Sequence, residues 1–223
     1  MVIAIDGPAA SGKSTTSKLV AQRLGYLYVD TGAMYRAMTL KVLESNTNLE
    51  DKQAIARLAR STEICLQPHN SELRVFVDKR DVTEAIRSQE VTKAVSAVSM
   101  VKDVREFMVR QQRRMSERGG VIVEGRDIGT VVLPDADLKI FMVADVRQRA
   151  QRRQEELRQQ GIEVPLDDLI EEIRERDRKD SDRDISPLRK SADAIELDTS
   201  HLTIEEQVDF ITRKVEEIQR KDH

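Results

Sequence analysis

Nine consecutive residues near the start of the chain have the types and spacing that bind phosphate. They are Gly7, Pro8, Ala9, Ala10, Ser11, Gly12, Lys13, Ser14 and Thr15. The first eight form the pattern G-x-x-x-x-G-K-S, in which glycines let the backbone wrap an anion so that N–H groups point toward it. We expect Lys13 to neutralise the outer phosphates of a nucleoside triphosphate. We expect the Ser14 hydroxyl to ligate Mg²⁺ together with phosphates and water.

Two predicted elements hold this phosphate-binding loop. Residues 2–6 are a short apolar run that predicts a buried strand, and residues 13–24 predict a helix that begins at the phosphate. The positive end of that helix dipole adds to the anion site. The same order returns at 26–30 and 31–44. A strand–helix–strand–helix order predicts a parallel sheet with right-handed crossovers.

Arginines follow two other predicted strands. Arg36 lies after the second strand, and Arg126 lies directly after a strand predicted at 121–124. The carboxyl ends of strands in an open α/β sheet share one crevice, so both arginines should meet Lys13 there. Three cations in one crevice are costly unless anions fill it, which favours a triphosphate donor facing a phosphorylated acceptor. The alternative is that both arginines pair with local carboxylates such as Asp127.

A third group of charges lies at 145–183, which predicts two helices broken near 161–165. Arg176, Asp180 and Arg183 share one helix face because they are spaced i, i+4, i+7. Such a face suits a lid, since arginines stabilise charge on a transferring phosphoryl group. We expect most of the other charges in this stretch to form a solvated face with pairs at i, i+4.

The middle of the chain departs from the strand–helix alternation. Segments 62–67 and 73–78 are strand-like around a turn at 68–71, and valines at a three-to-four spacing predict helix within 83–118. We therefore expect residues 60–118 to be an insertion into the α/β core.

The core resumes after this insertion. Residues 121–124, 138–144 and 194–197 predict buried strands, and residues 203–220 predict a closing helix with an apolar stripe. Together with the first two, these make five strands.

Length and composition bound the class of protein. The chain has 223 residues, enough for one sizeable α/β domain with an insertion, and its net charge of −3 gives no general attraction to nucleic acid or anionic membranes. The single cysteine, Cys65, excludes an internal disulfide and suits a reducing compartment. No apolar run approaches the roughly 20 residues of a membrane span, and a strand starting at residue 2 leaves no room for a signal peptide. We expect a cytoplasmic monomer that binds neither nucleic acid nor membrane.

Four segments together resemble the bacterial cytidylate kinase family across nearly the whole chain. They are residues 7–14, 30–36 (D-T-G-A-M-Y-R), 124–130 (E-G-R-D-I-G-T) and 176–180 (R-D-R-K-D). The resemblance implies transfer of the ATP γ-phosphoryl group to CMP or dCMP, giving CDP or dCDP, with Mg²⁺. It implies a P-loop NTPase-type three-layer α/β fold with a five-stranded parallel sheet flanked by helices.

The resemblance also implies a division of the chain into three parts. The core would comprise 1–59, 119–150 and 184–223. An α+β nucleoside-monophosphate-binding insertion would comprise 60–118, and a helical lid region 151–183.

The resemblance further implies roles for individual residues. The acceptor phosphate would be held by Arg36 and Arg126. The cytosine would be read by Ser96, Arg105 and Asp127. The ribose, base and phosphate would be surrounded by Thr31, Tyr35, Arg176, Asp180 and Arg183. The groups that stabilise charge during transfer would be Lys13, Arg126, Arg176 and Arg183.

Two positions depart from the family pattern, and a third position, Asp127, has a physical rationale for reading the base. Thr31 stands where the family often has Ser, and Glu124 where it often has Asp, which alters the reach of this carboxylate toward Mg²⁺ or water. Asp127 can accept a hydrogen bond from the cytosine 4-amino group, whereas uracil presents an oxygen there. A lost hydrogen bond to a charged group costs about 1.5–3 kcal/mol, so CMP should outcompete UMP by roughly ten- to a hundredfold.

Other classes remain as alternatives. A switch GTPase would need an Asn-Lys-x-Asp segment, which the sequence lacks. A P-loop kinase of another small acceptor, such as shikimate, shares the loop but not the insertion or the set Ser96, Arg105 and Asp127. A nucleotide-dependent RNA-associated protein would use the charged helices at 145–183.

Overall fold

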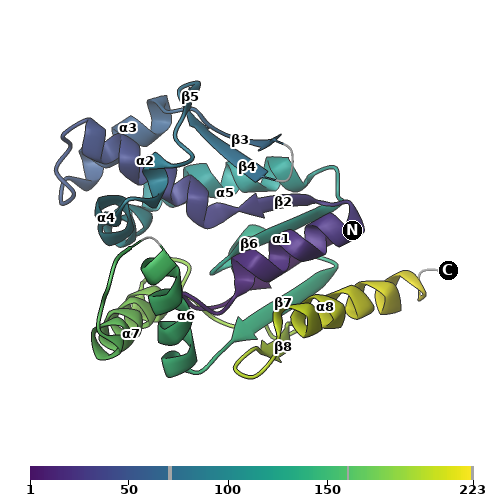
Figure 1. Cartoon of the computed structure of the whole chain (residues 1–223). Helices are drawn as coiled ribbons and strands as arrows, with labels where there is room; N and C mark the ends of the chain where they lie inside the picture. The colour runs from purple at the N-terminus through teal and green to yellow at the C-terminus, as the bar shows by residue number, and fades with distance from the viewer. Residues whose placement is uncertain (70–71, 160, 222–223) are drawn as a thin grey trace.

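A five-stranded parallel sheet forms the centre of the molecule (Figure 1). The computed structural model describes residues 1–69, 72–159 and 161–221. The strands lie in the order β2-β6-β1-β7-β8. Their bounds are β1 Val2–Asp6, β2 Leu27–Asp30, β6 Val121–Gly125, β7 Leu138–Val143 and β8 Ile195–Asp198. The sheet and the strand count confirm the predicted fold class, and β1 lies between β6 and β7 because its apolar side chains are buried on both faces.

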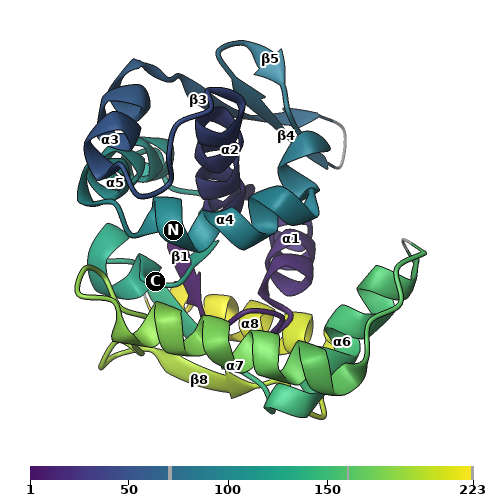
Figure 2. The same ribbon diagram turned by 90° about the vertical axis from the view of Figure 1, so that its left-hand side faces the viewer.

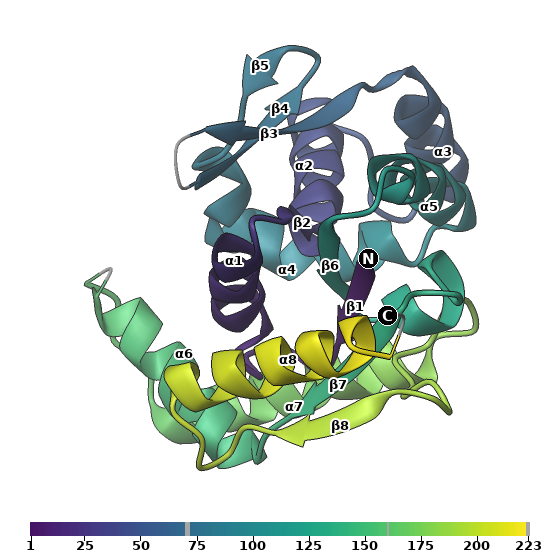
Figure 3. The same ribbon diagram turned by 90° about the vertical axis from the view of Figure 1, so that its right-hand side faces the viewer.

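Helices cover both faces of this sheet (Figure 3). On one face, α1 (Lys13–Leu24) and α8 (Ile204–Gln219) pack on the sheet through a cluster that includes Val20 and Ile211. On the other face, α5 (Lys102–Ser116) and the short π-helix η2 (Ile128–Val132) cover the sheet. The result is the predicted three-layer arrangement. The α8 helix begins with a capping box between Thr203 and Glu206.

A second body of structure surrounds α2 (Thr31–Glu44). It comprises α3 (Lys52–Ser61), an antiparallel sheet of β3 (Ile64–His69), β4 (Glu72–Val77) and β5 (Arg80–Asp81), then η1 (Ala85–Arg87) and α4 (Gln89–Ser99). One apolar cluster joins α2, α3, β3, β4, α4 and α5. Because α3 belongs to that cluster, the packing begins before residue 60, where the sequence places the start of the insertion.

Two local predictions in this region need correction. The helical stretch predicted at 83–118 is three helices, since the chain leaves helical geometry after η1 and again at Val101, which is extended. The valines of the predicted stripe are nevertheless all buried, and all but Val91 belong to the same apolar cluster; they are Val91, Val95, Val98, Val101 and Val104. The charged residues 78–81 predict a second turn, which is tighter in the structure: Asp78 and Lys79 adopt positive φ, and β5 follows at once. Part of the turn predicted at 68–71 lies outside the described residues.

The charged stretch at 145–183 forms two helices, as predicted. They are α6 (Val146–Gln159) and α7 (Leu166–Asp182), and the chain breaks at Gly161, which has φ 76°, and at Pro165, which precedes α7. The pair has its own apolar cluster, and Ala10 of the phosphate-binding loop packs against it. Contact with this loop places the helix pair beside the end of β1.

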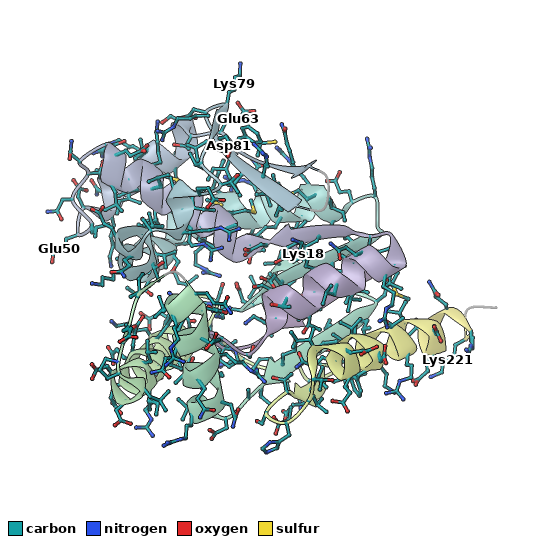
Figure 4. The ribbon with its side chains drawn as sticks, viewed as in Figure 1. Lys18, Glu50, Glu63, Lys79, Asp81 and Lys221 are labelled. Carbon is teal, nitrogen blue, oxygen red and sulfur yellow. The ribbon has the colours of Figure 1, made fainter. Side chains whose placement is uncertain are left out.

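The carboxyl edge of the central sheet is flanked from two sides. Figure 2 shows α4 lying on one side of this edge and α6 and α7 on the other. Charged side chains cover the exterior, and those of Lys79, Asp81 and Glu63 extend from the tip of the antiparallel sheet (Figure 4). Within the part of the chain that the structure describes, no helix has the length and apolar character needed to cross a membrane.

Candidate active site

The phosphate-binding loop runs from the end of β1 to the start of α1. Gly7 has φ 151°, and a Cβ atom there would lie 2.1 Å from the Met142 carbonyl oxygen, so no larger residue fits. Gly12 has φ 90° and directly precedes α1, whose free N–H groups face the loop. Ala10 has φ 58°, an uncommon conformation for a residue with a side chain, which here is held against the helix pair. The loop is thus shaped by backbone geometry for close approach to an anion.

Lys13 lies inside this loop rather than in solvent. Its ammonium donates to the Pro8 carbonyl oxygen at 2.6 Å and to the Ser11 hydroxyl at 3.3 Å. Burial, and then the nearby Arg126, lower the pKa of Lys13. An anion bound in the loop would favour the charged form of Lys13, so this side chain fits a phosphate-binding role.

Ser14 and Glu124 meet beside Lys13. The Ser14 hydroxyl donates to Glu124 Oε1 at 2.6 Å, and Glu124 Oε2 is buried without a hydrogen-bond partner among the described residues. Burial, and then Asp30, raise the pKa of Glu124. A hydroxyl and a carboxylate with an open oxygen are hard oxygen donors of the kind that Mg²⁺ prefers, so these residues fit that ion.

Arg36 and Arg126 each pair with a carboxylate. Arg36 Nη2 lies 2.9 Å from Asp30 Oδ2, while Asp30 Oδ1 accepts from the Ala33 N–H and caps α2. Arg126 Nε lies 2.9 Å from Asp180 Oδ2. The alternative of local pairing therefore holds in part, although the partner of Arg126 comes from α7 and is not Asp127.

The predicted lid face points toward Arg126. Burial, and then Arg126, lower the pKa of Arg176 to about 10. Although burial opposes the effect, Arg126 lowers the pKa of Asp180. Arg183 directly follows α7, and its Nη1 lies 3.8 Å from Asp180 Oδ1. The structure thus brings Arg126, Arg176, Asp180 and Arg183 together.

Asp127 is the centre of a buried cluster of charges. It pairs with Arg105, and Arg183 Nη2 lies 3.8 Å from its Oδ1. The guanidinium carbon of Arg105 lies 5.4 Å from the centre of the Tyr35 ring, and burial raises the pKa of Tyr35 to about 12. Among the described residues, Arg105 Nε and Arg183 Nη2 have no hydrogen-bond partner. The cluster therefore presents two buried donors to a ligand.

Two other expected nucleotide contacts are less direct. The Thr31 hydroxyl donates to the Glu124 carbonyl oxygen at 2.7 Å, so its proton is used within the protein. A Cβ atom at Gly125 would lie 2.7 Å from that hydroxyl, which explains the glycine there. Ser96 is half-buried on α4, and its carbonyl oxygen accepts from the Ser99 hydroxyl at 3.1 Å.

Some arginines of the charged stretch are not solvated, which corrects the expectation for them. Arg149 is buried, and its Nη1 lies 2.7 Å from Asp177 Oδ2 and 3.2 Å from the Ala9 carbonyl oxygen. Arg152 donates to Thr199, whose hydroxyl donates to the Ser11 carbonyl oxygen at 3.0 Å. Both tie α6 to the phosphate-binding loop, a role that i, i+4 spacing cannot reveal.

Other arginines do form surface pairs, although at i, i+3, whereas the expected i, i+4 spacing is found for Lys179 and Glu175 at 3.2 Å. Arg174 pairs with Glu171 at 2.6 Å and Arg178 with Glu175 at 2.7 Å, all on the exterior of α7. Their charges are neutralised locally, which disfavours the RNA-associated alternative.

Asp6 is the residue near the site that the sequence reasoning missed. It ends β1, is buried, and accepts hydrogen bonds from two backbone N–H groups. A carboxylate that ends an otherwise apolar strand, directly before the loop, was the available signal.

Together, a phosphate-binding loop at the carboxyl edge of a parallel sheet and arginines from two flanking bodies define a P-loop kinase. The family model described as Cytidylate kinase matches residues 3–217. The chain is 50% identical over 218 residues to a cytidylate kinase of Bacillus subtilis, covering 98% of this chain and 97% of that protein. It is 52% identical over 215 residues to one of a Geobacillus species, covering 96% of each. The chain belongs to the cytidylate kinase family.

Solved structures of other kinases share the fold at low identity. A shikimate kinase from Bacteroides thetaiotaomicron aligns with a TM-score of 0.50 and 12% identity, covering 97% of this chain and 98% of that one. A gluconokinase from Sinorhizobium meliloti aligns with a TM-score of 0.50 and 13% identity, covering 100% of this chain and 97% of that one. These likenesses concern the fold alone.

Proposed function

We propose that this kinase transfers the γ-phosphoryl group of ATP to CMP or dCMP and yields ADP with CDP or dCDP. Membership of the cytidylate kinase family supports this activity. The observation that carries the substrate assignment is the buried Asp127, held between Arg105 and Arg183 and next in sequence to Arg126.

The donor half of the site is the loop at 7–15. Its N–H groups and Lys13 would hold the ATP phosphates, and Ser14 would ligate Mg²⁺, with Glu124 close enough to bind the ion or its water. When bound, Mg²⁺ would neutralise charge on the donor phosphates. Arg149 would keep the loop in place through the Ala9 carbonyl oxygen.

The acceptor half is built around the arginines after β2 and β6. Arg36 and Arg126 would hold the CMP phosphate, and Asp127 would accept from the 4-amino group of cytosine. The open donors Arg105 Nε and Arg183 Nη2 would meet oxygen atoms of the nucleotide. Ser96, Tyr35 and Thr31 would complete the wall of the site.

Catalysis would follow from positioning and electrostatics. A phosphate oxygen of CMP attacks the γ-phosphorus, a P–O bond forms, and the bond to the β–γ bridging oxygen breaks to release ADP. Lys13, Arg126, Arg176 and Arg183 would stabilise the charge shared by the two phosphates as they approach. No covalent intermediate on the protein is needed.

The division into core, insertion (60–118) and lid (151–183) belongs to this proposal. So do a monomeric state, a place in pyrimidine nucleotide metabolism and a cytoplasmic location. The helix pair α6 and α7 would exclude water when both nucleotides are bound.

An acceptor panel tests the proposal. ADP release is followed with ATP, Mg²⁺ and CMP, dCMP, UMP, AMP or GMP in turn. We expect turnover with CMP and dCMP, with kcat/KM for UMP lower by roughly ten- to a hundredfold. Comparable values of kcat/KM for CMP, AMP and GMP would contradict the proposal.

A further inference from the structure

Asp6 is a buried carboxylate near the site that has no role in the proposed reaction as described above. It is the last residue of β1, lies directly before Gly7, and is 5% exposed. Oδ1 accepts from the Ile128 N–H at 2.8 Å, and Oδ2 accepts from the Gly129 N–H at 2.7 Å. Each oxygen therefore holds one of two successive amides.

Those amides begin η2, and the two residues directly before them are Arg126 and Asp127. The π-helical character of η2 is shown by the Leu133 N–H, which donates to the Ile128 carbonyl oxygen five residues back at 2.7 Å. At the other end of η2, Arg113 of α5 donates to the Val131 and Val132 carbonyl oxygens, both at 2.8 Å. The segment is thus fixed to β1 at its start and to α5 at its end.

The contact between Asp6 and η2 is close. A Cβ atom on Gly129 would lie 3.4 Å from Asp6 Oδ2 and 3.2 Å from Lys139 Cδ. Only a carboxylate offers two acceptors in so small a space, whereas an amide side chain would turn an N–H group toward one of the backbone N–H groups. Burial raises the pKa of Asp6 to about 6, and the charged groups that face it are Asp127 and Lys13. The protein therefore keeps a carboxylate here although burial disfavours its charged form, and an apolar residue would leave the two backbone N–H groups without an acceptor.

We propose that Asp6 is a positioning residue that aligns the acceptor with the donor. One carboxylate on the strand that leads into the phosphate-binding loop fixes the segment that carries Arg126 and Asp127. A shift of η2 away from β1 would move both side chains relative to Lys13. This inference rests on the proposed function, because it assigns the aligned acceptor to CMP.

The kinetic test compares D6N with D137N. Asp137 also binds a backbone N–H of β1, that of Val2 at 2.6 Å, but at the opposite end of the strand. In D6N we expect kcat/KM for CMP to fall roughly ten- to a hundredfold, with a weaker preference for CMP over UMP. The KM for ATP in D6N should stay within about twofold of the wild-type value. In D137N, kcat/KM for CMP, the CMP to UMP preference and the KM for ATP should all stay within about twofold of wild type. The proposal would be overturned if the KM for ATP in D6N rose by as large a factor as kcat/KM for CMP fell. It would also be overturned if the ratio of kcat/KM for CMP to that for UMP were unchanged.

Amide hydrogen exchange without nucleotides gives a readout that needs no activity. We expect the Ile128 and Gly129 amides to be protected in the wild-type protein and in D137N, and to exchange at least about tenfold faster in D6N. Unchanged protection in D6N would overturn the proposal. Wild-type protein without activity on CMP would instead contradict the proposed function and leave the exchange result standing.

G129A keeps the test decisive if D6N does not fold. This variant retains the Asp6 charge but places a Cβ atom 3.2 Å from Lys139 Cδ and 3.4 Å from Asp6 Oδ2, so the side chains packed between β1 and η2 must give by a few tenths of an ångström. We expect the same kinetic pattern with a smaller loss, about three- to tenfold in kcat/KM for CMP. A folded G129A with unchanged kinetics toward CMP would contradict the positioning role.

Discussion

At the residue scale, the site is built from carboxylates that each hold more than one group. Asp30 caps α2 and pairs with Arg36, Asp180 pairs with Arg126 and lies near Arg183, and Asp127 pairs with Arg105 and also lies near Arg183. Such pairs keep buried and half-buried arginines in fixed positions, so that an anionic substrate meets them without further ordering. Removing one partner would leave the other charged and buried.

The charge on Asp6 makes a testable contribution to stability. Burial raises its pKa from an ordinary value of 3.8 to about 6, so the folded state binds this proton more tightly than the unfolded state does. The stability gained from protonation is therefore fully present below about pH 4 and is lost as the pH rises through about 6. Relative to wild type, the free energy of unfolding of D6N should increase by roughly 2–3 kcal/mol between pH 4 and pH 7.

Urea titrations of both proteins at pH 4, 5.5 and 7 measure this difference. If the free energies of unfolding of D6N and wild type differ by the same amount at all three pH values, Asp6 titrates normally in the folded protein.

At the element scale, the helix pair α6 and α7 is joined to the loop by Arg149. In R149M, Asp177 loses its partner and the Ala9 carbonyl oxygen loses a donor. We expect the free energy of unfolding to fall by about 1–3 kcal/mol, a moderate loss because the unpaired Asp177 is partly exposed. We expect the KM for ATP to rise several-fold, because the loop loses the contact at Ala9. Thermal denaturation and initial rates at varied ATP measure both effects.

R174M is the matched control for R149M. Arg174 pairs with Glu171 on the exposed face of α7, so its loss should change the free energy of unfolding by at most about 0.5 kcal/mol. Equal effects of R149M and R174M would argue against a tie between α6 and the loop.

The elements of the core could be predicted from sequence because each has a local signal. The apolar runs of β1, β6 and β7 are buried on both faces, and Gly25 and Thr203 mark a helix end and a helix start. The break between α4 and α5 could not be predicted, because the valine stripe continues across it. The π-helix η2 could not be predicted either, since its geometry depends on Asp6 and Arg113, which are distant in sequence.

The site shows the same division between local and distant signals. The phosphate-binding loop is contiguous and has its own pattern. The pairing of Arg126 with Asp180 joins residues that are 54 positions apart, so only the folded chain reveals it. Spacing does not distinguish Arg149 from its solvated neighbours, because its contacts with Asp177 and Ala9 join residues that are distant in sequence.

At the scale of the whole molecule, the proposed acceptor site lies where the sheet core, the proposed insertion and the helix pair meet. Asp127 follows β6, Arg105 lies on α5 and Arg183 follows α7. CMP should therefore stabilise all three bodies together. At about 100 times its Kd, a ligand adds roughly 2.7 kcal/mol, which for a chain of this size raises Tm by about 5–10 °C.

Thermal denaturation with CMP and with UMP at the same concentration checks this expectation. UMP should give a clearly smaller rise in Tm, because its base presents an oxygen to Asp127. Equal shifts would argue that the base does not contact the Asp127 cluster.

The most direct test of the central claim is the ratio of kcat/KM for CMP to kcat/KM for UMP, measured for wild type and D127N. An asparagine can offer its amide N–H to the uracil oxygen as readily as its carbonyl to the cytosine amino group. With both proteins folded by circular dichroism, we expect the ratio to favour CMP in the wild type and to fall by roughly ten- to a hundredfold in D127N. A ratio in D127N equal to that of the wild type would contradict the assignment of Asp127 as the residue that reads the base.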